Sequence, residues 1–405
     1  MLALLDCNNF FVSCERLYRP SLKNKPVVVL SSNDGCIISR SNEVKAMGVP
    51  MGEPYFRVEK FLKSRGVAVC SGNIAAYKEI SNKVMSVLSR YTDGLEEYSI
   101  DEAFFNFPEY AVPDPVSYSA GVRGEIDRQV GIPASIGIAM TKTLSKLASQ
   151  KAKKTESGVA AITKNNSDSI LQTTPVGDVW GIGRKNAEKL NRFGIITAFD
   201  FVRKDPVWIK KIMSIRGVMT QYELRSQPCY HLVTERAKPK SIQVSRTWGR
   251  KITSVDDIER AIIDNILKAG TLLRRDCLAA KSMCVYIRRG YRHHGECAYL
   301  KEDFYFNEPV MSDIELINTA RDLIRKIFIP GYQYTQGGIT LCNFTDANYR
   351  QRTLFDDGDE RKTKYERISH VTDEINYRLG RRAIYPAALA VKDKPWKPHR
   401  EHLGR

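Results

Sequence analysis

The stretch Glu97-Tyr98-Ser99-Ile100-Asp101-Glu102-Ala103-Phe104-Phe105 places two adjacent carboxylates inside a run of apolar and β-favouring residues. Such a run predicts a β-hairpin with Asp101 and Glu102 near its turn. Neighbouring carboxylates raise each other's pKa unless a cation lies between them, so the pair indicates a divalent metal site. Acidic residues are also common in solvated turns, and the stretch alone leaves both interpretations open.

The composition of the chain indicates a polyanionic partner. The 405 residues are enough for two to four domains, and a hydrophobic fraction of 42% favours well-packed ones. Lys and Arg number 63 against 46 Asp and Glu, which gives a formal net charge of +17 and a pI of about 9.4. Nucleic acid is the first candidate for the partner, and an anionic membrane surface is the second.

Several classes of protein are excluded by what the chain lacks. No stretch approaches transmembrane length and the first residues have no basic signal region, so we expect a cytoplasmic protein without a membrane partner. The nine cysteines are scattered and form no C-x-x-C pair, which predicts reduced thiols. The first histidine is His231, so chemistry in the N-terminal half has to use carboxylates and a metal.

The first 139 residues predict a ferredoxin-like order of elements. Apart from an excursion at about 20–75, strands at 3–5, around the acidic hairpin and at 134–139 alternate with helices at 75–91 and 116–130, giving β-α-β-β-α-β. In this fold the first strand lies beside the hairpin, so Asp6 reaches Asp101 and Glu102. Three carboxylates are hard oxygen ligands of the kind that Mg²⁺ takes together with substrate phosphates.

A helix is expected at 10–17, directly after Asp6. Asn8 or Asn9 is available as its N-cap, and its unpaired backbone N–H groups suit an anion. Asp6 has an alternative role here, because a carboxylate in this position can simply cap the helix.

The rest of the chain predicts basic modules. A lysine-rich helix at 141–154 either binds an anion or presents a solvated face. Gly181 and Gly183 resemble the turn of a helix-hairpin-helix element, whose backbone amides approach a DNA phosphate. Residues 235–243 predict a tether between domains.

Beyond the tether we expect a basic α+β module that reaches to about residue 344. Its strands are expected at 282–288 and 336–342 and its helices at 255–273 and 314–327. The cations that suit contact with a duplex are Arg246, Arg250, Lys251, Arg274, Arg275, Arg288, Arg289 and Arg292. A further helix is expected at 365–379, stopping at Gly380, and then a loose basic tail at 392–405.

Three motifs in combination resemble a Y-family translesion DNA polymerase. They are the opening Leu5-Asp6-Cys7-Asn8-Asn9-Phe10-Phe11-Val12-Ser13-Cys14-Glu15, the core Ser99-Ile100-Asp101-Glu102-Ala103, and Lys142-Thr143-Leu144-Ser145-Lys146-Leu147-Ala148. Within that family, Ser32 to Ser41 and Asp178 to Gly183 look like the UmuC type, the catalytic subunit of DNA polymerase V. The DinB type fits less well.

The resemblance implies roles for individual residues. Asp6, Asp101, Glu102 and the backbone carbonyl of Cys7 would hold two Mg²⁺ ions. Phe11 would be the steric gate that excludes a ribose 2′ hydroxyl, with a core aromatic as the alternative. The triphosphate would be bound by Asn9, Phe10, Ser39, Asn42, Lys45 and Lys153, with Lys154 as a competitor for the last role. Asn42 and Lys45 depart from the tyrosine and arginine of relatives.

The resemblance also implies a multidomain α+β architecture shaped like a right hand. Its parts would be a ferredoxin-like palm at 1–19 and 76–165, small fingers at 20–75, a helix-hairpin-helix-like helical thumb at 166–232, a tether at 233–243, an α+β little finger at 244–345, and a clamp-binding peptide with a C-terminal tail at 346–405. The peptide is Gln351 to Phe355, in which Gln351, Leu354 and Phe355 would contact a sliding clamp. Leu354 and Phe355 tucking onto their own domain is the alternative.

The function implied is template-directed, error-prone DNA synthesis past damaged bases, in SOS-type repair and mutagenesis. Primer-template DNA and deoxynucleoside triphosphates would be the substrates, a UmuD′-like dimer and a RecA filament the partners, and the nucleoid the place of action. The chain ends without the tail sequence typical of the UmuC type, which affects RecA docking. No proofreading domain is recognisable. The alternatives are a nucleotide cyclase with a similar palm and a non-catalytic DNA-binding scaffold.

Overall fold

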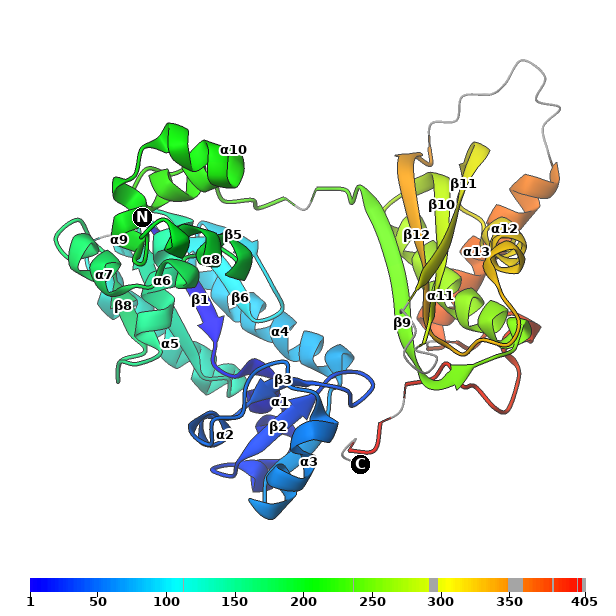
Figure 1. Cartoon of the computed structure of the whole chain (residues 1–405), viewed down its shortest axis with the longest axis horizontal. Coiled ribbons are helices and arrows are strands. Elements are labelled where there is room, and N and C mark those ends of the chain that lie inside the picture. Colours follow the sequence, from blue (N-terminus) through cyan, green and yellow to red (C-terminus); the bar gives the residue numbers. More distant parts are fainter. Residues whose placement is uncertain are drawn as a thin grey trace. The chain divides into compact units, whose positions relative to one another are not determined.

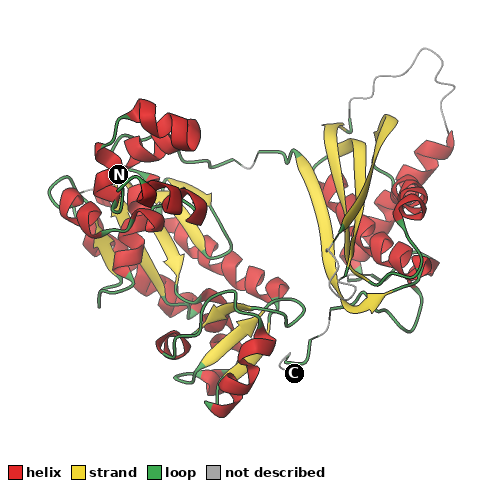
Figure 2. Cartoon of the chain, in the orientation of Figure 1, coloured by secondary structure: helices red, strands yellow, loops and turns green. Residues whose placement is uncertain are grey.

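The computed structural model describes residues 1–111, 113–235, 237–290, 298–348, 360–380, 382–398 and 400–402. The chain divides into two compact units, Met1–Arg236 with His402–Arg405, and Ala237–Glu401. Each unit combines helices with β-sheet (Figure 2). No helix in the described ranges is long and apolar enough to cross a membrane.

The central sheet of the first unit contains the hairpin that the sequence predicts. Its strands are β1 (Leu2–Cys7), β5 (Gly94–Glu97), β6 (Glu102–Asn106), β7 (Ala134–Ala139) and β8 (Val159–Ala161), in the order β5-β6-β1-β7-β8 (Figure 1). Strand β1 pairs with both β6 and β7, as in the predicted ferredoxin-like order. Its apolar residues are buried because helices cover both faces: α4 (Ile74–Leu88) and α5 (Pro115–Val130) on one side, α6 (Lys142–Ala152) on the other.

Helix α6 lies very close to the sheet at Gly137 of β7. A Cβ on Gly137 would be 2.0 Å from the backbone nitrogen of Ser149 and 2.3 Å from the carbonyl oxygen of Ser145. Any side chain at this position would therefore push the helix away from the strand. The close packing also buries Lys142, so the solvated-face interpretation of this lysine-rich helix is wrong for that residue.

A small sheet interrupts the palm within the predicted excursion. Its strands β3 (Ile37–Arg40), β2 (Val27–Leu30) and β4 (Ala68–Ser71) lie in that order, with helices α2 (Asn42–Ala46) and α3 (Tyr55–Ser64). Strand β2 is buried on both faces. Val28 and Leu30 join the core of the small sheet, whereas Val27 and Val29 join the apolar layer shared with α1 (Phe10–Tyr18) and α4. The predicted fingers therefore share an apolar layer with the predicted palm.

The last part of the first unit is helical: α7 (Ser167–Thr173), α8 (Arg184–Arg192), α9 (Ala198–Arg203) and α10 (Pro206–Leu224). Glu223, buried at the end of α10, accepts hydrogen bonds from the backbone N–H of Thr143 at 3.0 Å and of Cys229 at 2.7 Å. These bonds join the predicted thumb to α6 of the palm.

The second unit contains a sheet of order β11-β10-β12-β9 with helices on one face (Figure 1). In chain order its elements are β9 (Ser241–Ile252), α11 (Val255–Arg275), β10 (Leu278–Arg289), β11 (Tyr299–Val310), α12 (Asp313–Ile327) and β12 (Tyr334–Asp346). The helices and the strands β10 and β12 confirm the sequence prediction, but β9 and β11 were not predicted. The tether is shorter than predicted, because β9 begins at Ser241 and Ile242 is already in the core.

The C-terminal segment belongs to the second unit. Helix α13 (Glu360–Arg378) confirms the helix predicted at 365–379, and Gly380 follows with φ +100°. The tail is not loose where the structure describes it, because Leu389 and Trp396 are buried in the core of the unit and Asp393 pairs with Arg250. The described residues of α13 and of 382–398 thus pack on the core of the second unit and are not a separate appendage.

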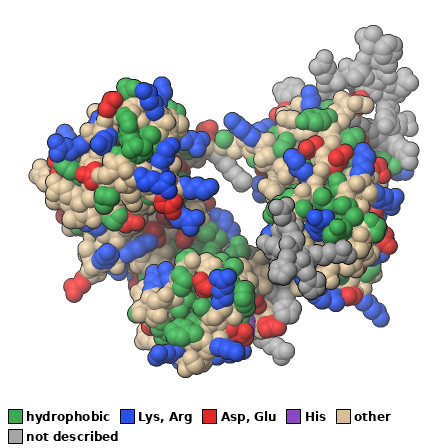
Figure 3. Space-filling view, in the orientation of Figure 1, with side chains coloured by type: hydrophobic (Ala, Val, Ile, Leu, Met, Phe, Trp, Pro, Cys, Tyr) green, Lys and Arg blue, Asp and Glu red, His purple; other side chains and the backbone are tan. Residues whose placement is uncertain are grey.

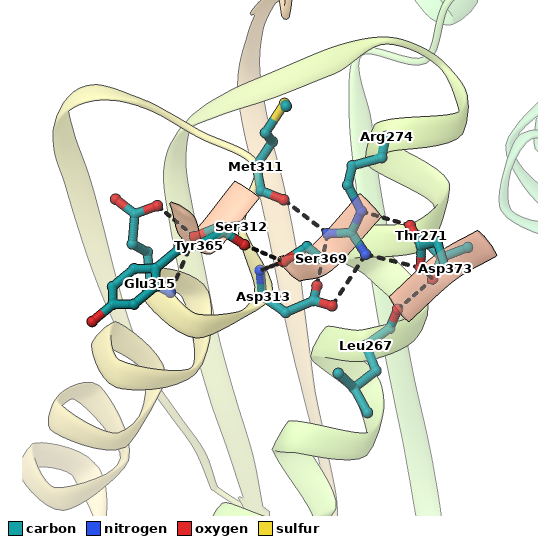
Figure 4. A network of polar contacts seen from close by, with 10 residues as sticks. All are labelled: Leu267, Thr271, Arg274, Met311, Ser312, Asp313, Glu315, Tyr365, Ser369 and Asp373. Atoms are coloured by element: carbon teal, nitrogen blue, oxygen red, sulfur yellow. Dashed lines mark hydrogen bonds and ion pairs between the residues drawn. The ribbon is translucent and has the colours of Figure 1, made fainter. Parts of the chain in front are cut away.

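Arg274, expected among the DNA-facing cations, is buried and ion-paired. Its guanidinium donates to Asp313 of α12, to Asp373 of α13 and to the carbonyl oxygen of Met311 (Figure 4). Ser369 of α13 donates to the carbonyl oxygen of Tyr365 and accepts from the backbone N–H of Asp313. This cluster docks α13 and is not a DNA contact.

Candidate active site

The three predicted carboxylates lie near one another at one end of the sheet of β1, close enough for Glu102 and Asp101 to act on the charge of Asp6. Asp6 and Glu102 are direct partners in the antiparallel pairing of β1 and β6. The turn before Glu102 is tied to β1, because the backbone N–H of Cys7 donates to the carbonyl oxygen of Asp101 at 2.9 Å. The hydroxyl of Ser99 donates to Asp101 at 2.6 Å and accepts from the backbone N–H of Glu102 at 3.1 Å, which shapes the turn.

Two lysines neutralise two of these carboxylates. The Nζ atom of Lys153 lies 2.6 Å from Asp6 Oδ2, and Nζ of Lys146 lies 3.0 Å from Glu102 Oε1. Lys146 also lies 4.6 Å from the ring centroid of Tyr98. Lys153, which is expected to bind the triphosphate, is ion-paired with Asp6 in this structure. The pairing of Lys146 was not predicted, because it depends on how α6 is seated against β7.

Asp6 remains incompletely neutralised by this arrangement. Burial raises its pKa to about 6, against the opposing attraction and hydrogen bond of Lys153, and Glu102 and Asp101 raise it further. A carboxylate in this state gains from a nearby cation of higher charge than an ammonium group.

The donor set fits a hard divalent cation. Carboxylate oxygens from Asp6, Asp101 and Glu102, with the Cys7 carbonyl on the same strand, are the ligand types that Mg²⁺ prefers. Within the described residues, no three Asp, Glu, His or Cys side chains are grouped as a ready metal cage.

The start of α1 is tied to the fingers. Asn9 has left-handed φ of 46° and donates to the side-chain oxygen of Asn42 at 3.0 Å, while Lys45 donates to Asn9 Oδ1 at 2.5 Å. Asn9 is the N-cap residue of α1, one of the two that the sequence offered, but its side chain makes no cap hydrogen bond. Three of the predicted triphosphate residues are brought together in this way, while Ser39 is buried on neighbouring β3.

Positive charge gathers beside these asparagines. The pKa of Lys45 is lowered by burial and then by the nearby charges of Lys153 and Arg40. The mutual repulsion of these cations favours an anion between them. Arg40 was not predicted as a site residue, although its place at the end of β3, two residues before α2, was a usable signal.

Phe10 and Phe11 follow Asn9 on α1. Phe10 is buried in the core, whereas Phe11 is half-buried and stacks on Tyr77, with ring centroids 5.0 Å apart. Phe11 therefore has one face against protein and remains partly open, as a steric gate requires, while it also belongs to the edge of the core.

Sequence comparisons identify the family. Residues 5–150 match the model of the impB/mucB/samB family, residues 239–354 match its C-terminal domain, and residues 164–195 match the HHH motif of the same group. Protein ImpB of Salmonella typhimurium is 33% identical over 100% of this chain and 96% of its own length. Protein UmuC of Salmonella typhimurium is 32% identical over 100% of this chain and 97% of its own length.

The chain belongs to the UmuC group of Y-family DNA polymerases. DNA polymerase IV of Staphylococcus aureus strain Newman is a more distant relative, 28% identical over 87% of this chain and 97% of its own length. Among solved structures, the Y-family DNA polymerase chimera Dbh-Dpo4(243-245)-Dbh shares the fold, with a TM-score of 0.71 over 84% of this chain and 98% of that one, at 21% identity.

The thumb of this Y-family chain presents the predicted glycine turn. Gly181 has φ +91°, which favours glycine, and Gly183 is the N-cap of α8. Trp180, just before the turn, donates to the Tyr98 hydroxyl at 3.3 Å and packs on Tyr230. The turn is therefore fixed to the palm hairpin by an aromatic contact, while its amides lie at the start of a helix.

The predicted little-finger arginines lie in different settings. By strand register, Arg288 shares the open face of the sheet, on which Tyr299 lies opposite it in β11. Arg246 is on the helix-covered face, in line with buried Ile242 and Trp248. Arg250 pairs with Asp393, and Arg289 lies 4.2 Å from the ring centroid of Tyr332. Arg288, on the open face of the sheet, and Arg250, whose side chain is 60% exposed, have the more open settings of these four.

Lys and Arg side chains are spread over both units on the face drawn in Figure 3. The predicted clamp-binding residues Gln351, Leu354 and Phe355, and the little-finger Arg292, lie outside the described residues.

Proposed function

We propose that this chain catalyses template-directed, error-prone DNA synthesis past damaged bases by nucleotidyl transfer with two Mg²⁺ ions. The observation that carries the proposal is the register of β1 and β6, which sets Asp6 opposite Glu102 with Asp101 in the adjoining turn. Asp6, Asp101, Glu102 and the Cys7 carbonyl would hold the ions, which when bound would activate a primer 3′ hydroxyl and neutralise the leaving pyrophosphate.

The lysines are suited to exchange partners during nucleotide binding. The side chain of Lys153 is 40% exposed and contacts Asp6. Its charge also helps to lower the pKa of nearby Lys45. A triphosphate between Lys45, Lys153 and Arg40 would relieve the repulsion among these cations and draw Lys153 from the carboxylate. Backbone N–H groups of Asn9 and Phe10 at the start of α1 would bind the same phosphates, with Asn42 and Ser39 nearby.

Phe11 would select the sugar of the incoming nucleotide. Its partly exposed ring stacks on Tyr77, and the other side of the ring would exclude a 2′ hydroxyl from the bound nucleotide. The thumb amides at Gly181 and Gly183 and the open-face Arg288 would bind primer-template DNA without reading its sequence.

The wider setting follows from the family. We propose an SOS-type role in the cytoplasm, at the nucleoid, with a sliding clamp bound through Gln351, Leu354 and Phe355. A UmuD′-like dimer and a RecA filament are the further partners proposed. We also propose that the chain has no 3′ to 5′ exonuclease, so a mispaired primer should stay intact when incubated with pure protein.

Primer extension across an abasic template tests the proposal. Wild-type protein with Mg²⁺, deoxynucleotides, clamp and accessory subunits is expected to extend the primer, and Asp101→Ala to abolish extension while binding the DNA as tightly. Full activity of Asp101→Ala would refute the mechanism. Tight DNA binding by wild type without any extension would instead establish the scaffold alternative, and DNA-independent turnover of a nucleoside triphosphate would establish the cyclase.

A further inference from the structure

A chain of buried contacts runs behind the proposed sugar gate. Tyr77, on α4, is fully buried, and its ring is stacked on Phe11 with an interplanar angle of 24°. Its hydroxyl donates to Glu15 Oε1 at 2.5 Å. Glu15 lies one helical turn after Phe11 on α1, so the same helix holds both the gate ring and the group that fixes its support.

The carboxylate of Glu15 is itself held in place. It is 7% exposed, and its second oxygen accepts from the guanidinium of Arg19, one turn further along α1. Arg19 also donates to the Sγ atom of Cys70 on β4 at 2.8 Å. The set Tyr77, Glu15, Arg19 and Cys70 therefore joins α1 of the palm, α4 and the edge of the fingers sheet.

Tyr77 and Cys70 keep the protonation states that these contacts need. Burial, and then the hydrogen bond to Glu15, raises the pKa of Tyr77, so its hydroxyl remains a donor. Burial raises the pKa of Cys70 to about 11, and Arg19 opposes this, so Cys70 stays a neutral thiol beside Arg19. The buried carboxylate of Glu15 is held by two donors, Tyr77 and Arg19, which restrict its position. Because the Tyr77 hydroxyl is bonded to this carboxylate, the Tyr77 ring is restricted as well.

We propose that Tyr77, anchored by Glu15 and Arg19, is a positioning residue that holds the Phe11 ring in place and thereby sets how strictly the chain excludes ribonucleotides. Tyr77 acts through Phe11 and has no contact with the nucleotide in this role. The inference rests on the proposed function for its readout in sugar selection, but the positioning of Phe11 is testable without catalysis.

Three variants separate the parts of this support. Tyr77→Phe keeps the stacked ring and removes the hydrogen bond, Glu15→Gln keeps an acceptor but removes the charge pair with Arg19, and Tyr77→Leu removes the stack. Losing one such buried hydrogen bond is expected to lower the deoxy-to-ribo ratio of kcat/KM by about three- to tenfold. Tyr77→Leu is expected to lower it by a larger factor. Incorporation of deoxynucleotides should change less than incorporation of ribonucleotides.

Tyr118→Phe is the matched control. Tyr118, on α5, donates its hydroxyl to the carbonyl oxygen of Tyr91 at 2.9 Å, shares a 3.3 Å hydroxyl contact with Tyr110, and packs on the ring of Phe107. It should leave the deoxy-to-ribo ratio unchanged.

A double-mutant comparison distinguishes positioning from general stability. In a Phe11→Leu background the gate is gone, so Tyr77→Phe should have no further effect on the ratio. An equal effect of Tyr77→Phe with and without Phe11 would refute the inference.

A spectroscopic readout keeps the inference testable if no primer is extended. With 4-fluorophenylalanine at position 11, the ¹⁹F resonance should shift or broaden in Tyr77→Phe and Glu15→Gln but not in Tyr118→Phe. An inactive wild type would refute the proposed function while this resonance still decides the positioning. A resonance that responds to none of the variants would overturn the inference.

Discussion

The palm and the second unit each contain a cluster of opposite charges, and the two are built differently. Arg274 is buried with its side chain 2% exposed, and each of its guanidinium nitrogens donates to a fixed acceptor, including bidentate contact with Asp313. In the palm, each lysine reaches one carboxylate from a flexible stem, and Lys153 is partly in solvent. The first arrangement stabilises one structure, whereas the second can be exchanged for a substrate and its cations.

The largest effect on stability is expected from breaking the cluster of Arg274 with Asp313 and Asp373. Arg274→Met leaves Asp313 and Asp373 without their shared cation and should lower the free energy of unfolding of the second unit by about 3–5 kcal/mol. Arg275→Met is the control, since Arg275 is half-exposed and pairs only with its neighbour Asp276 among the ion pairs described. Chemical denaturation of the full chain, followed through the second unit, measures both. Equal loss in the two variants would contradict the comparison.

Breaking the lysine–carboxylate cluster of the palm should reduce activity much more than stability. Glu102→Gln removes a ligand charge from a half-open site, so stability should change by less than about 1 kcal/mol. Primer extension with Mg²⁺ should fall by at least about a hundredfold. Glu97→Gln, on the same hairpin but exposed, is the control and should retain activity. A stability loss in Glu102→Gln as large as that in Arg274→Met would show that both clusters are structural.

The pH dependence of stability sharpens the contrast. Burial raises the pKa of Asp6 to about 6 from 3.8, so the folded state binds this proton more tightly than the unfolded state. The contribution of Asp6 to the free energy of unfolding should therefore fall by up to about 3 kcal/mol as pH rises from about 4 to 6 in metal-free buffer. Denaturation curves of wild type and Asp6→Asn should diverge in this window. Added Mg²⁺ should reduce the divergence, and parallel curves would contradict the prediction.

The smallest effect is expected at Lys146. Lys146→Met removes a competitor for Glu102, so the Mg²⁺ concentration that gives half-maximal extension should decrease by about two- to fivefold, with stability within about 1 kcal/mol of wild type. Lys154→Met, at an exposed position beyond α6, is the control. An increased requirement for Mg²⁺ would mean that Lys146 supports the site instead of competing for it.

The carboxylate site was predictable because it depends on topology alone. The apolar run before Asp6, the hairpin around Asp101 and the order of elements suffice to place β1 beside β6. The lysine contacts depend on the rotation and height of α6, which are set by the approach of Ser145 and Ser149 to Gly137. Such packing between distant residues leaves no periodic pattern in the sequence.

The setting of Arg246 could have been predicted from the sequence, whereas the packing partner of α13 could not. Ile242, Val244, Arg246 and Trp248 alternate with exposed residues, which already assigns Arg246 to the covered face of a strand. The helix at 365–379 was predicted, but its inward face is formed by Glu366, Ser369 and Asp373, so hydrophobic periodicity gave no indication of what it packs against. Polar docking of a helix becomes visible only with its partner, Arg274.

The register of β1 also fixes the order of events during synthesis. β1 is made early, yet its partners are residues 102–106 and 134–139, so its apolar residues Leu2 to Leu5 stay unpaired while about a hundred residues are added. At translation rates of about 5–20 residues per second this wait lasts several seconds or more. An apolar strand that waits this long for its partners is exposed to non-native contacts, and Asp6 meets Glu102 only after the same delay.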